Sequence, residues 1–267
     1  MSSHGPRHRI AVAAPAVPPG PPTACQGCTL DGLCRPSTLG DAPSAVAPIV
    51  RMLTRGDVLF KAGERFGALF AVCSGFFKTR VAHPGRPDRI TGFKMAGEWM
   101  GLDGIHSSQH GCEAIAVEDS RVCVIPYRQV EDECRRSLDT LRRFHQAMSH
   151  EIVRQQSLID MLAGMRAEAR LAAFVIDLSR RAASGASAAT TLNLPMTREE
   201  IGGFLGMTLE TVSRCFSRLH GDGLLRVSHR RIDILDADRL DLLAGSPEDG
   251  LPRPEPVAVL ALEESAN

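Results

Sequence analysis

A short stretch near the C-terminus constrains the fold more than any other feature of the chain. Thr197 and Glu200 match the Thr-x-x-Glu capping box that opens a helix. Gly206 can end that helix in a left-handed conformation, and Thr208 can cap a second helix directly after it. Two helices joined by so tight a turn are typical of a helix-turn-helix.

The second of these helices carries residues suited to reading base pairs. Apolar residues recur at helical spacing and are expected to face inward: Leu209, Val212, Phe216 and Leu219. Arg can bind guanine bidentately, Glu can accept from cytosine N4, and Ser can donate or accept. The residues expected to contact DNA are therefore Thr208, Glu210, Ser213, Arg214, Ser217 and Arg218.

A basic segment follows this helix. Residues 224–234, after Gly223, predict a small β-hairpin wing, and residues 214–231 contain five Arg and one Asp. The whole chain of 267 residues balances 31 Lys+Arg against 31 Asp+Glu, so its neutral total conceals a local phosphate-binding patch. The alternative, a pair of helices with a merely solvated polar face, is disfavoured.

The region from Val50 to Tyr127 has a different pattern of apolar residues and glycines. Short apolar runs alternate with glycines at even intervals, namely residues 58–60, 69–72, 76–81 and 122–125. Such spacing predicts an antiparallel sandwich or barrel.

A long helix is predicted after this region. Apolar and polar residues step by four and three along a heptad seam: Leu141, His145, Met148, Ile152, Gln155, Ile159 and Leu162. The strict alternation favours a helix that pairs with its copy in a homodimer, and the polar seam residues would weaken that dimer enough for regulation. The alternative is a helix that packs only on its own domain.

Cysteines form a second group of candidate functional residues. Cys25, Cys28 and Cys34 follow a Pro-rich segment, and three close cysteines need a fourth ligand to complete a tetrahedral or cubane site. Cys112 lies in a polar, glycine-containing loop and is the favoured fourth ligand. The remaining cysteines are expected to be packing residues: Cys73, Cys123, Cys134 and Cys215. The spacing favours an iron–sulfur cluster and zinc equally, with free thiols third.

These patterns divide the chain into six parts. They are a disordered tail (1–23), a cysteine-rich segment (24–49), a sensor domain (50–136), a dimerisation helix (137–164), a DNA-binding domain (165–243) and a second tail (244–267). No apolar run is long enough to cross a bilayer, so a cytoplasmic protein is expected. An enzyme is not expected, because the sequence shows no Ser/His/Asp arrangement, P-loop or dinucleotide fingerprint.

From about Cys25 to Leu243 the chain closely resembles the Crp/Fnr superfamily, specifically its oxygen-sensing fumarate and nitrate reduction regulators. The resemblance rests on Cys25-x2-Cys28-x5-Cys34 and on residues 59–63, 90–93, 96–98, 167–174 and 209–214. It implies an α+β fold with an N-terminal cyclic-nucleotide-binding-like β-roll, a long dimerisation helix and a C-terminal winged helix-turn-helix.

The resemblance also implies a mechanism. One [4Fe–4S] cluster per subunit would be held by Cys25, Cys28, Cys34 and Cys112, and would favour the dimer until oxygen destroys it. Each subunit would read a TTGAT-type half-site of double-stranded DNA, and the regulator would act on RNA polymerase. No cyclic nucleotide is expected, because residues 101–120 contain no Arg to hold its phosphate.

Overall fold

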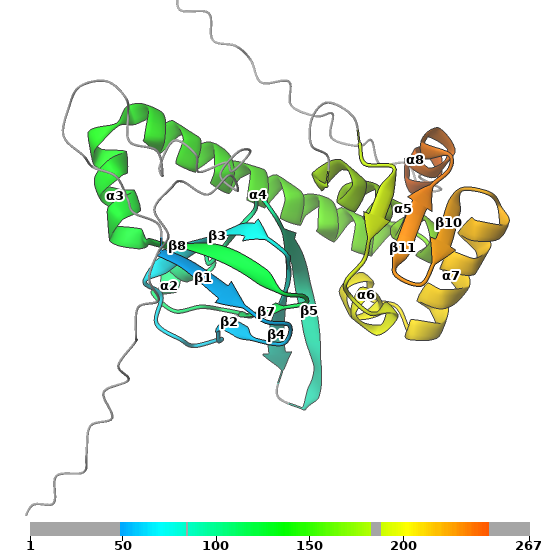
Figure 1. Cartoon of the computed structure of the whole chain (residues 1–267), viewed down its shortest axis with the longest axis horizontal. Helices are drawn as coiled ribbons and strands as arrows, with labels where there is room; N and C mark the ends of the chain where they lie inside the picture. Colours follow the sequence, from blue (N-terminus) through cyan, green and yellow to red (C-terminus); the bar gives the residue numbers. More distant parts are fainter. Residues whose placement is uncertain (1–48, 84, 183–187, 246–267) are drawn as a thin grey trace, which may run out of the picture.

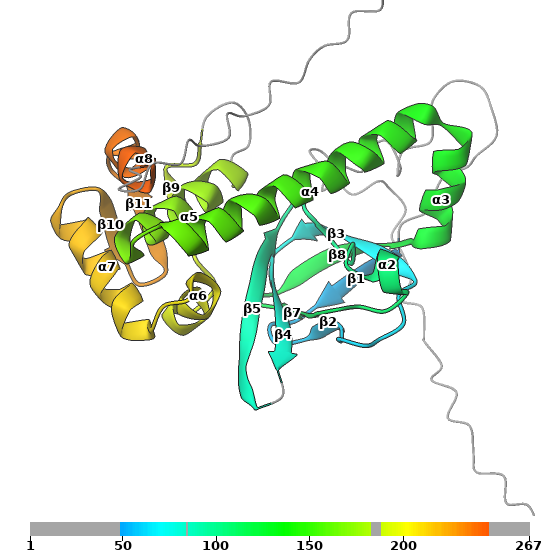
Figure 2. The same ribbon diagram turned by 180° about the vertical axis from the view of Figure 1, so that it is seen from behind.

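Two domains joined by one long helix make up the chain in the computed structural model (Figures 1 and 2). The structure describes residues 49–83, 85–182 and 188–245. The tail 1–23, almost all of the tail 244–267, and Cys25, Cys28 and Cys34 of the cysteine-rich segment lie outside these ranges. The α+β fold class is confirmed.

The N-terminal domain is a β-roll of two antiparallel sheets. One sheet has the strand order β1 (Ile49–Leu53), β8 (Ser120–Pro126), β3 (Ala68–Ser74) and β6 (Trp99–Met100). The other has the order β2 (Val58–Phe60), β7 (Glu113–Ala116), β4 (Phe76–His83) and β5 (Arg86–Met95). The predicted apolar runs thus form β2, β3, β4 and β8.

Alternation along the strands gives the first sheet two apolar faces. Phe70 and Val72 of β3 point between the sheets, where Phe77 of β4 meets them. Leu69 and Ala71 point to the opposite face, which the helices cover. Alternating residues face opposite sides because the side-chain period of a strand is two.

Helices cover this outer face. The short α2 (Gly104–Ser107) precedes β7, α3 (Tyr127–Arg136) follows β8, and α4 (Leu138–Gly164) then runs back along the sheet. Ser137 begins α4 by accepting a hydrogen bond from the Thr140 amide. Phe144 of α4 packs against Trp99 with ring centroids 6.0 Å apart.

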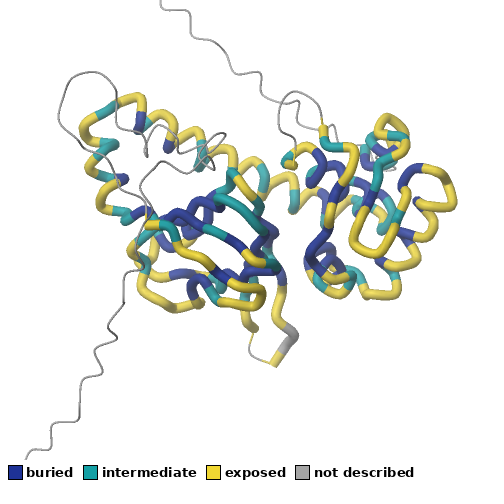
Figure 3. The backbone as a smooth tube through the Cα atoms, in the orientation of Figure 1, coloured by how far each residue is buried: buried dark blue, intermediate teal, exposed yellow. Residues whose placement is uncertain are grey.

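The face of α4 that carries the predicted dimer seam is open. Phe144 and Met161 are buried against the protein, whereas Ile152 and Ile159 are 58% and 65% exposed. Most residues of α4 are exposed or half-buried, as the colours along this helix show in Figure 3. His145 and Gln155 are also exposed, and Leu141, Met148 and Leu162 are half-buried.

The C-terminal domain is a helical bundle with a small sheet. Its elements are α5 (Ala167–Arg181), β9 (Thr191–Asn193), α6 (Arg198–Leu205), α7 (Leu209–Gly221), β10 (Leu225–Ser228), β11 (Arg231–Ile234) and α8 (Ala237–Gly245). The predicted wing is the hairpin β10–β11, and β9 adds a third strand to it. Three elements, β9, α2 and α8, were not predicted from the sequence.

The two domains share one apolar core, which lies between β5 of the roll and the helices α5 and α6. Phe93 of β5 lies 5.2 Å from Phe204 of α6 and 6.1 Å from Phe174 of α5 between ring centroids. Lys78 of β4 forms an ion pair with Glu200 of α6 beside these rings. The C-terminal domain is thus packed directly on the second sheet of the roll.

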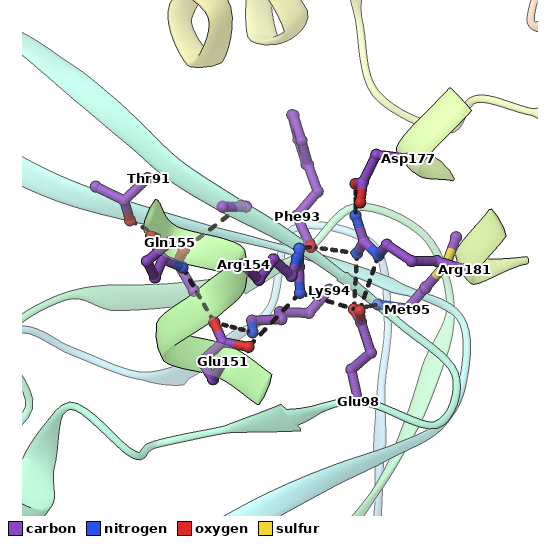
Figure 4. A network of polar contacts seen from close by, with 12 residues as sticks. Thr91, Phe93, Lys94, Met95, Glu98, Glu151, Arg154, Gln155, Asp177 and Arg181 are labelled. Carbon is purple, nitrogen blue, oxygen red and sulfur yellow. Dashed lines mark hydrogen bonds and ion pairs between the residues drawn. The ribbon is translucent and has the colours of Figure 1, made fainter. Parts of the chain in front are cut away.

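A buried polar network lies at the same junction (Figure 4). Glu98, in the turn between β5 and β6, binds Arg154 of α4 at 3.0 Å and Arg181 of α5 at 2.7 Å. Lys94 of β5 binds Glu151 of α4 at 2.6 Å. One carboxylate therefore connects the roll, the long helix and the C-terminal domain. Among the helices of the described ranges, none is long and apolar enough to span a bilayer.

Candidate nucleic-acid interface and cysteine sites

The helix-turn-helix is built by the predicted caps. The Thr197 hydroxyl accepts from the Glu200 amide at 3.1 Å, and the Glu200 carboxylate accepts from the Thr197 amide at 2.7 Å. Gly206 ends α6 at a φ of 66°, and Thr208 then caps α7 by accepting from the Thr211 amide at 3.1 Å. These caps fix the residues at which α6 and α7 begin and leave only a tight turn between the two helices.

The outer face of α7 presents every residue expected to contact DNA. These residues are all exposed: Thr208, Glu210, Ser213, Arg214, Ser217 and Arg218. Val212, Phe216 and Leu219 are buried on the inner face, as expected. Leu209 is an exception, since it is 53% exposed at the first turn of α7, where the bundle does not yet cover the helix.

Two arginines of α7 differ in their surroundings. The Arg214 side chain is 71% exposed, and its ion-pair partner among the described residues is Glu210 at 4.0 Å, one helical turn away. Arg218 forms an ion pair with Glu168 of α5. Arg214 is thus available to a base edge, whereas Arg218 is held toward α5 and suits a phosphate at the rim.

The basic patch extends from α7 onto the wing. Arg226, Arg230 and Arg231 are exposed on the hairpin β10–β11, and Arg231 also binds Asp233 at 2.9 Å. Exposed arginines on a wing beside a recognition helix are placed to bind backbone phosphates.

Arg198 is a member of this surface that the sequence reasoning missed. Its guanidinium lies over the Phe216 ring, 3.5 Å from the centroid, and borders a hollow of about 300 Å³ lined also by Ser213, Ser217 and His220. The face of an aromatic ring attracts a cation. The Phe216 ring therefore helps to hold the positive charge of Arg198 at the edge of this surface. The sequence signal for this role of Arg198 was its position directly after the helix cap Thr197.

The turn between α6 and α7 offers a matched pair of substitutions. A Cβ on Gly202 would lie 2.6 Å from the Met207 carbonyl oxygen, whereas one on Gly203 meets nothing closer than Ile90 at 3.8 Å. We expect Gly202→Ala to destabilise the domain by about 1–3 kcal/mol and to weaken DNA binding, because the turn must open. Gly203→Ala should instead stabilise α6 by up to about 1 kcal/mol. Urea unfolding and DNA titration measure both variants, and equal effects would contradict the close approach.

The cysteines in the described ranges do not form a metal site by themselves. No group of three or more His, Cys, Asp or Glu side chains there could hold a metal ion. The cysteines of these ranges are thiols outside any disulfide: Cys73, Cys112, Cys123, Cys134 and Cys215. A four-cysteine site built on Cys25, Cys28 and Cys34 must therefore draw its remaining ligand from this set.

Cys112 lies in the loop before β7, in contact with a carboxylate. Asp103 accepts hydrogen bonds from the Gly111 and Cys112 amides at 2.7 and 3.3 Å, and its oxygen lies 3.5 Å from the Cys112 sulfur. Burial and the Asp103 charge together raise the pKa of the Cys112 thiol to about 12. A metal ligand must be a thiolate, so this environment opposes ligation.

Cys123 and Cys73 form a pair on the helix-facing side of the first sheet. Their sulfur atoms lie 2.9 Å apart, and Cys123 is 4% exposed. The hydrogen bond to Cys123 lowers the pKa of Cys73 to about 7 against the opposing effect of burial. In the register of β1 and β8, Val50 lies opposite Cys123. The second residue of β1 therefore lies beside this thiol pair.

Family models match both domains. The model for a Crp-like helix-turn-helix domain matches residues 169–243, and the model for a cyclic nucleotide-binding domain matches residues 50–137.

Curated relatives match most of the chain. The transcriptional activator protein FnrA of Stutzerimonas stutzeri is 38% identical over 230 residues, which cover 84% of this chain and 94% of that protein. The fumarate and nitrate reduction regulatory protein of Escherichia coli (strain K12) is 37% identical over 225 residues, 83% of this chain and 90% of that one.

Solved structures share the architecture. The structure of FixK2 from Bradyrhizobium japonicum covers 75% of this chain and 98% of its own, with a TM-score of 0.68 and 25% identity. A transcriptional regulator of the CRP/FNR family from Thermus thermophilus covers 74% of this chain and 99% of its own, with a TM-score of 0.59 and 21% identity, and so supports the fold alone.

Proposed function

The chain belongs to the Crp/Fnr family of DNA-binding transcription regulators, and we propose that it is an oxygen-responsive member controlled by a [4Fe–4S] cluster. The observation that carries the DNA-binding part is the capped α6–α7 pair with Arg214 and Glu210 exposed on one face. The cysteine spacing Cys25-x2-Cys28-x5-Cys34 supports the cluster.

We infer that the active form is a homodimer that reads a palindrome of two TTGAT-type half-sites. The exposed apolar residues Ile152 and Ile159 on α4 support the dimer, because an apolar stripe on a long helix is stabilised by a second copy. A dimer sets two recognition helices about one DNA turn apart. The outcome at promoters, activation or repression, would depend on contact with RNA polymerase.

Three ligands of the cluster would be Cys25, Cys28 and Cys34, and the fourth is a choice between two thiols. The loop sequence pointed to Cys112, but the Asp103 carboxylate lies 3.5 Å from its sulfur, and burial together with that charge raises the pKa of the Cys112 thiol to about 12. Cys123 lies opposite Val50, where the chain leaves the cysteine-rich segment and enters β1. We therefore favour Cys123 as the fourth ligand and keep Cys112 as the alternative.

The part played by the protein follows from this location. When bound, the cluster supplies an oxygen-labile link between the segment 24–49 and the sheet. The outer face of β3 and β8 that holds Cys123 also packs against Phe144 of α4. Ordering of the segment on this face would favour the α4 position that pairs with its copy, and loss of the link would weaken the dimer.

Metal analysis of cysteine variants tests the cluster and its fourth ligand. Protein purified without oxygen should contain about four iron and four sulfide per chain, with a colour that bleaches in air. We expect Cys28→Ser and Cys123→Ser to lose the cluster and Cys112→Ser to keep it. The reverse pattern for the last two would restore Cys112 as the ligand. One zinc and no sulfide would leave a regulator with a structural zinc or a thiol switch.

The dimer is tested on α4. Ile159→Glu should weaken the cluster-loaded dimer more than about 100-fold, because each of two buried Ile side chains contributes roughly 1.5–3 kcal/mol. Gln156→Glu adds the same charge to an exposed position beside the seam and should leave the dimer intact. Sedimentation equilibrium under nitrogen measures both, and a monomer in both variants would mean that charge on α4, not the seam, is responsible.

The cyclic-nucleotide alternative is disfavoured by chemistry. The stretch that would cradle a cyclic phosphate, residues 101–120, contains no Arg, so the phosphate would lack its cationic partner. The match of residues 50–137 to a cyclic nucleotide-binding domain describes the β-roll fold that such a domain shares with this sensor.

A further inference from the structure

We propose that Cys73 and Cys123 are a redox site that closes to a disulfide across β3 and β8 in the cluster-free protein. The two sulfur atoms lie 2.9 Å apart. A disulfide bond requires about 2.05 Å, so the sulfurs need to approach by less than the length of one covalent bond. The disulfide itself does not depend on the proposed function. Only its consequence rests on that function, because the bond would occupy Cys123, the favoured fourth ligand of the cluster.

A bulge in β3 brings the two thiols together. Ala71 pairs with Cys123 and Val72 with Val122, but Ser74 pairs with Arg121, so Cys73 is the extra residue on its strand. A bulge re-aims the side chain at that position. Cys73 accordingly points along the sheet toward Cys123 and not straight across the ladder.

The two thiols differ in their exposure to solvent. Cys73 is half-buried and so is open to a small oxidant, whereas Cys123 is buried beside Ala71 and Ile125. The Arg121 guanidinium binds the Ser74 hydroxyl at 3.1 Å, close to Cys73. This arrangement suits an attacking thiol at the surface and a resolving thiol beneath it.

The reaction balances with a peroxide as oxidant. The Cys73 thiolate attacks one peroxide oxygen, which forms a sulfenic acid and releases one water after protonation. The Cys123 sulfur then attacks the Cys73 sulfur, and the sulfenic oxygen leaves as a second water. Two thiols lose two electrons and two protons, and the peroxide gains both.

Formation of the Cys73–Cys123 disulfide would prevent the chain from rebuilding its cluster. A Cys123 sulfur bonded to Cys73 cannot ligate iron, so the oxidised chain could not rebuild the cluster until a cellular thiol reduced the bond. Loss of the cluster to oxygen and closure of the disulfide by peroxide would then be separate oxidations, and the second would have to be reversed by a thiol before the cluster could be rebuilt.

Peptide mapping tests the proposal directly. Trypsin releases each cysteine alone, in peptides 66–78 and 122–128. The cluster-free full chain, exposed to a small excess of hydrogen peroxide and then alkylated, should give these two peptides linked, lighter by two hydrogens than their sum. Cys73→Ser should lose the linked species entirely. Cys134, a half-buried thiol packed on the same face, provides the matched control in peptide 129–135 and should stay alkylated.

Two outcomes would overturn the site. In the first, peptides 66–78 and 122–128 both remain alkylated at a dose that oxidises other cysteines. In the second, Cys123 is linked to the peptide that holds Cys25, Cys28 and Cys34. The same mapping on cluster-loaded protein separates the two proposals. Protection of Cys123 supports its role as a ligand, whereas equal linkage with and without the cluster keeps the disulfide and removes Cys123 from the ligand set.

Discussion

Arg214→Ala should weaken binding to a palindromic TTGAT-type duplex by about 30- to 20 000-fold. One bidentate Arg–guanine contact contributes roughly 1–3 kcal/mol of discrimination, and the proposed dimer would make two such contacts. Arg214 is 71% exposed, and its ion pair with Glu210 is long at 4.0 Å, so binding DNA breaks no strong ion pair among the described residues. Fluorescence anisotropy of anaerobic protein at a fixed salt concentration measures the change.

A matched arginine controls for the loss of charge. The Arg135 side chain on α3 is also 71% exposed and also has an ion-pair partner on its own helix, Asp132. Arg135→Ala should leave the affinity unchanged. Exchange of the guanine in each half-site should weaken the parent protein but have little further effect on Arg214→Ala. An equal loss on both duplexes and on unrelated DNA, with a smaller salt slope, would make Arg214 a phosphate contact.

The elements that the sequence predicted are those fixed by local chemistry. The capping box of Thr197 and Glu200, the left-handed Gly206 and the cap Thr208 depend only on residues within a few positions, so α6 and α7 could be predicted closely. Short apolar runs separated by glycines predicted β2, β3, β4 and β8 in the same way. The strand β9 is only three residues long and exists because it pairs with β11, so its own sequence carried little signal.

The parts that could not be predicted depend on register. Cys73 and Cys123 both looked like packing residues, and only the bulge after Val72 reveals that their sulfurs meet. Cys112 looked like an open loop thiol, and the Asp103 carboxylate that contacts it belongs to another turn of chain. A local pattern fixes which side of a strand a residue faces, but not which distant residue lies beside it.

Glu98 is the extreme case of such non-local placement. Its carboxylate accepts hydrogen bonds from Arg154 at 3.0 Å, from Arg181 at 2.8 and 2.7 Å, and from the Met95 amide at 2.8 Å. Burial opposes ionisation, but the charges of Arg181 and Arg154 outweigh it and hold the pKa of Glu98 below its usual range. One side chain thereby connects the roll to α4 and α5, the elements that would transmit the dimer state to the DNA-binding domain.

Glu98→Gln should lower the free energy of unfolding by about 1.5–3 kcal/mol at pH 7, the range for a lost hydrogen bond between charged groups. The amide removes the carboxylate that Arg154 and Arg181 share, and among the described residues these largely buried guanidinium groups then keep only Glu151 at 3.7 Å and Asp177 at 2.8 Å as acidic partners. Glu133→Gln is the matched control, because its carboxylate is exposed to the same 17% but binds the exposed Arg136 on the same helix. That change should cost no more than about 1 kcal/mol. Urea unfolding measures both variants without adding ions that would screen the pairs.

The pH dependence of this difference identifies the charge as its cause. Since the pKa of Glu98 is lowered on folding, its contribution is complete above the ordinary Glu value of about 4.3. It is lost as the pH falls through the lower pKa of the folded state. The gap in stability between the parent and Glu98→Gln should therefore be constant from about pH 7 to pH 5 and narrow below about pH 4. A gap that stayed constant to about pH 3 would assign the loss to altered hydrogen-bond geometry instead of to the buried charge.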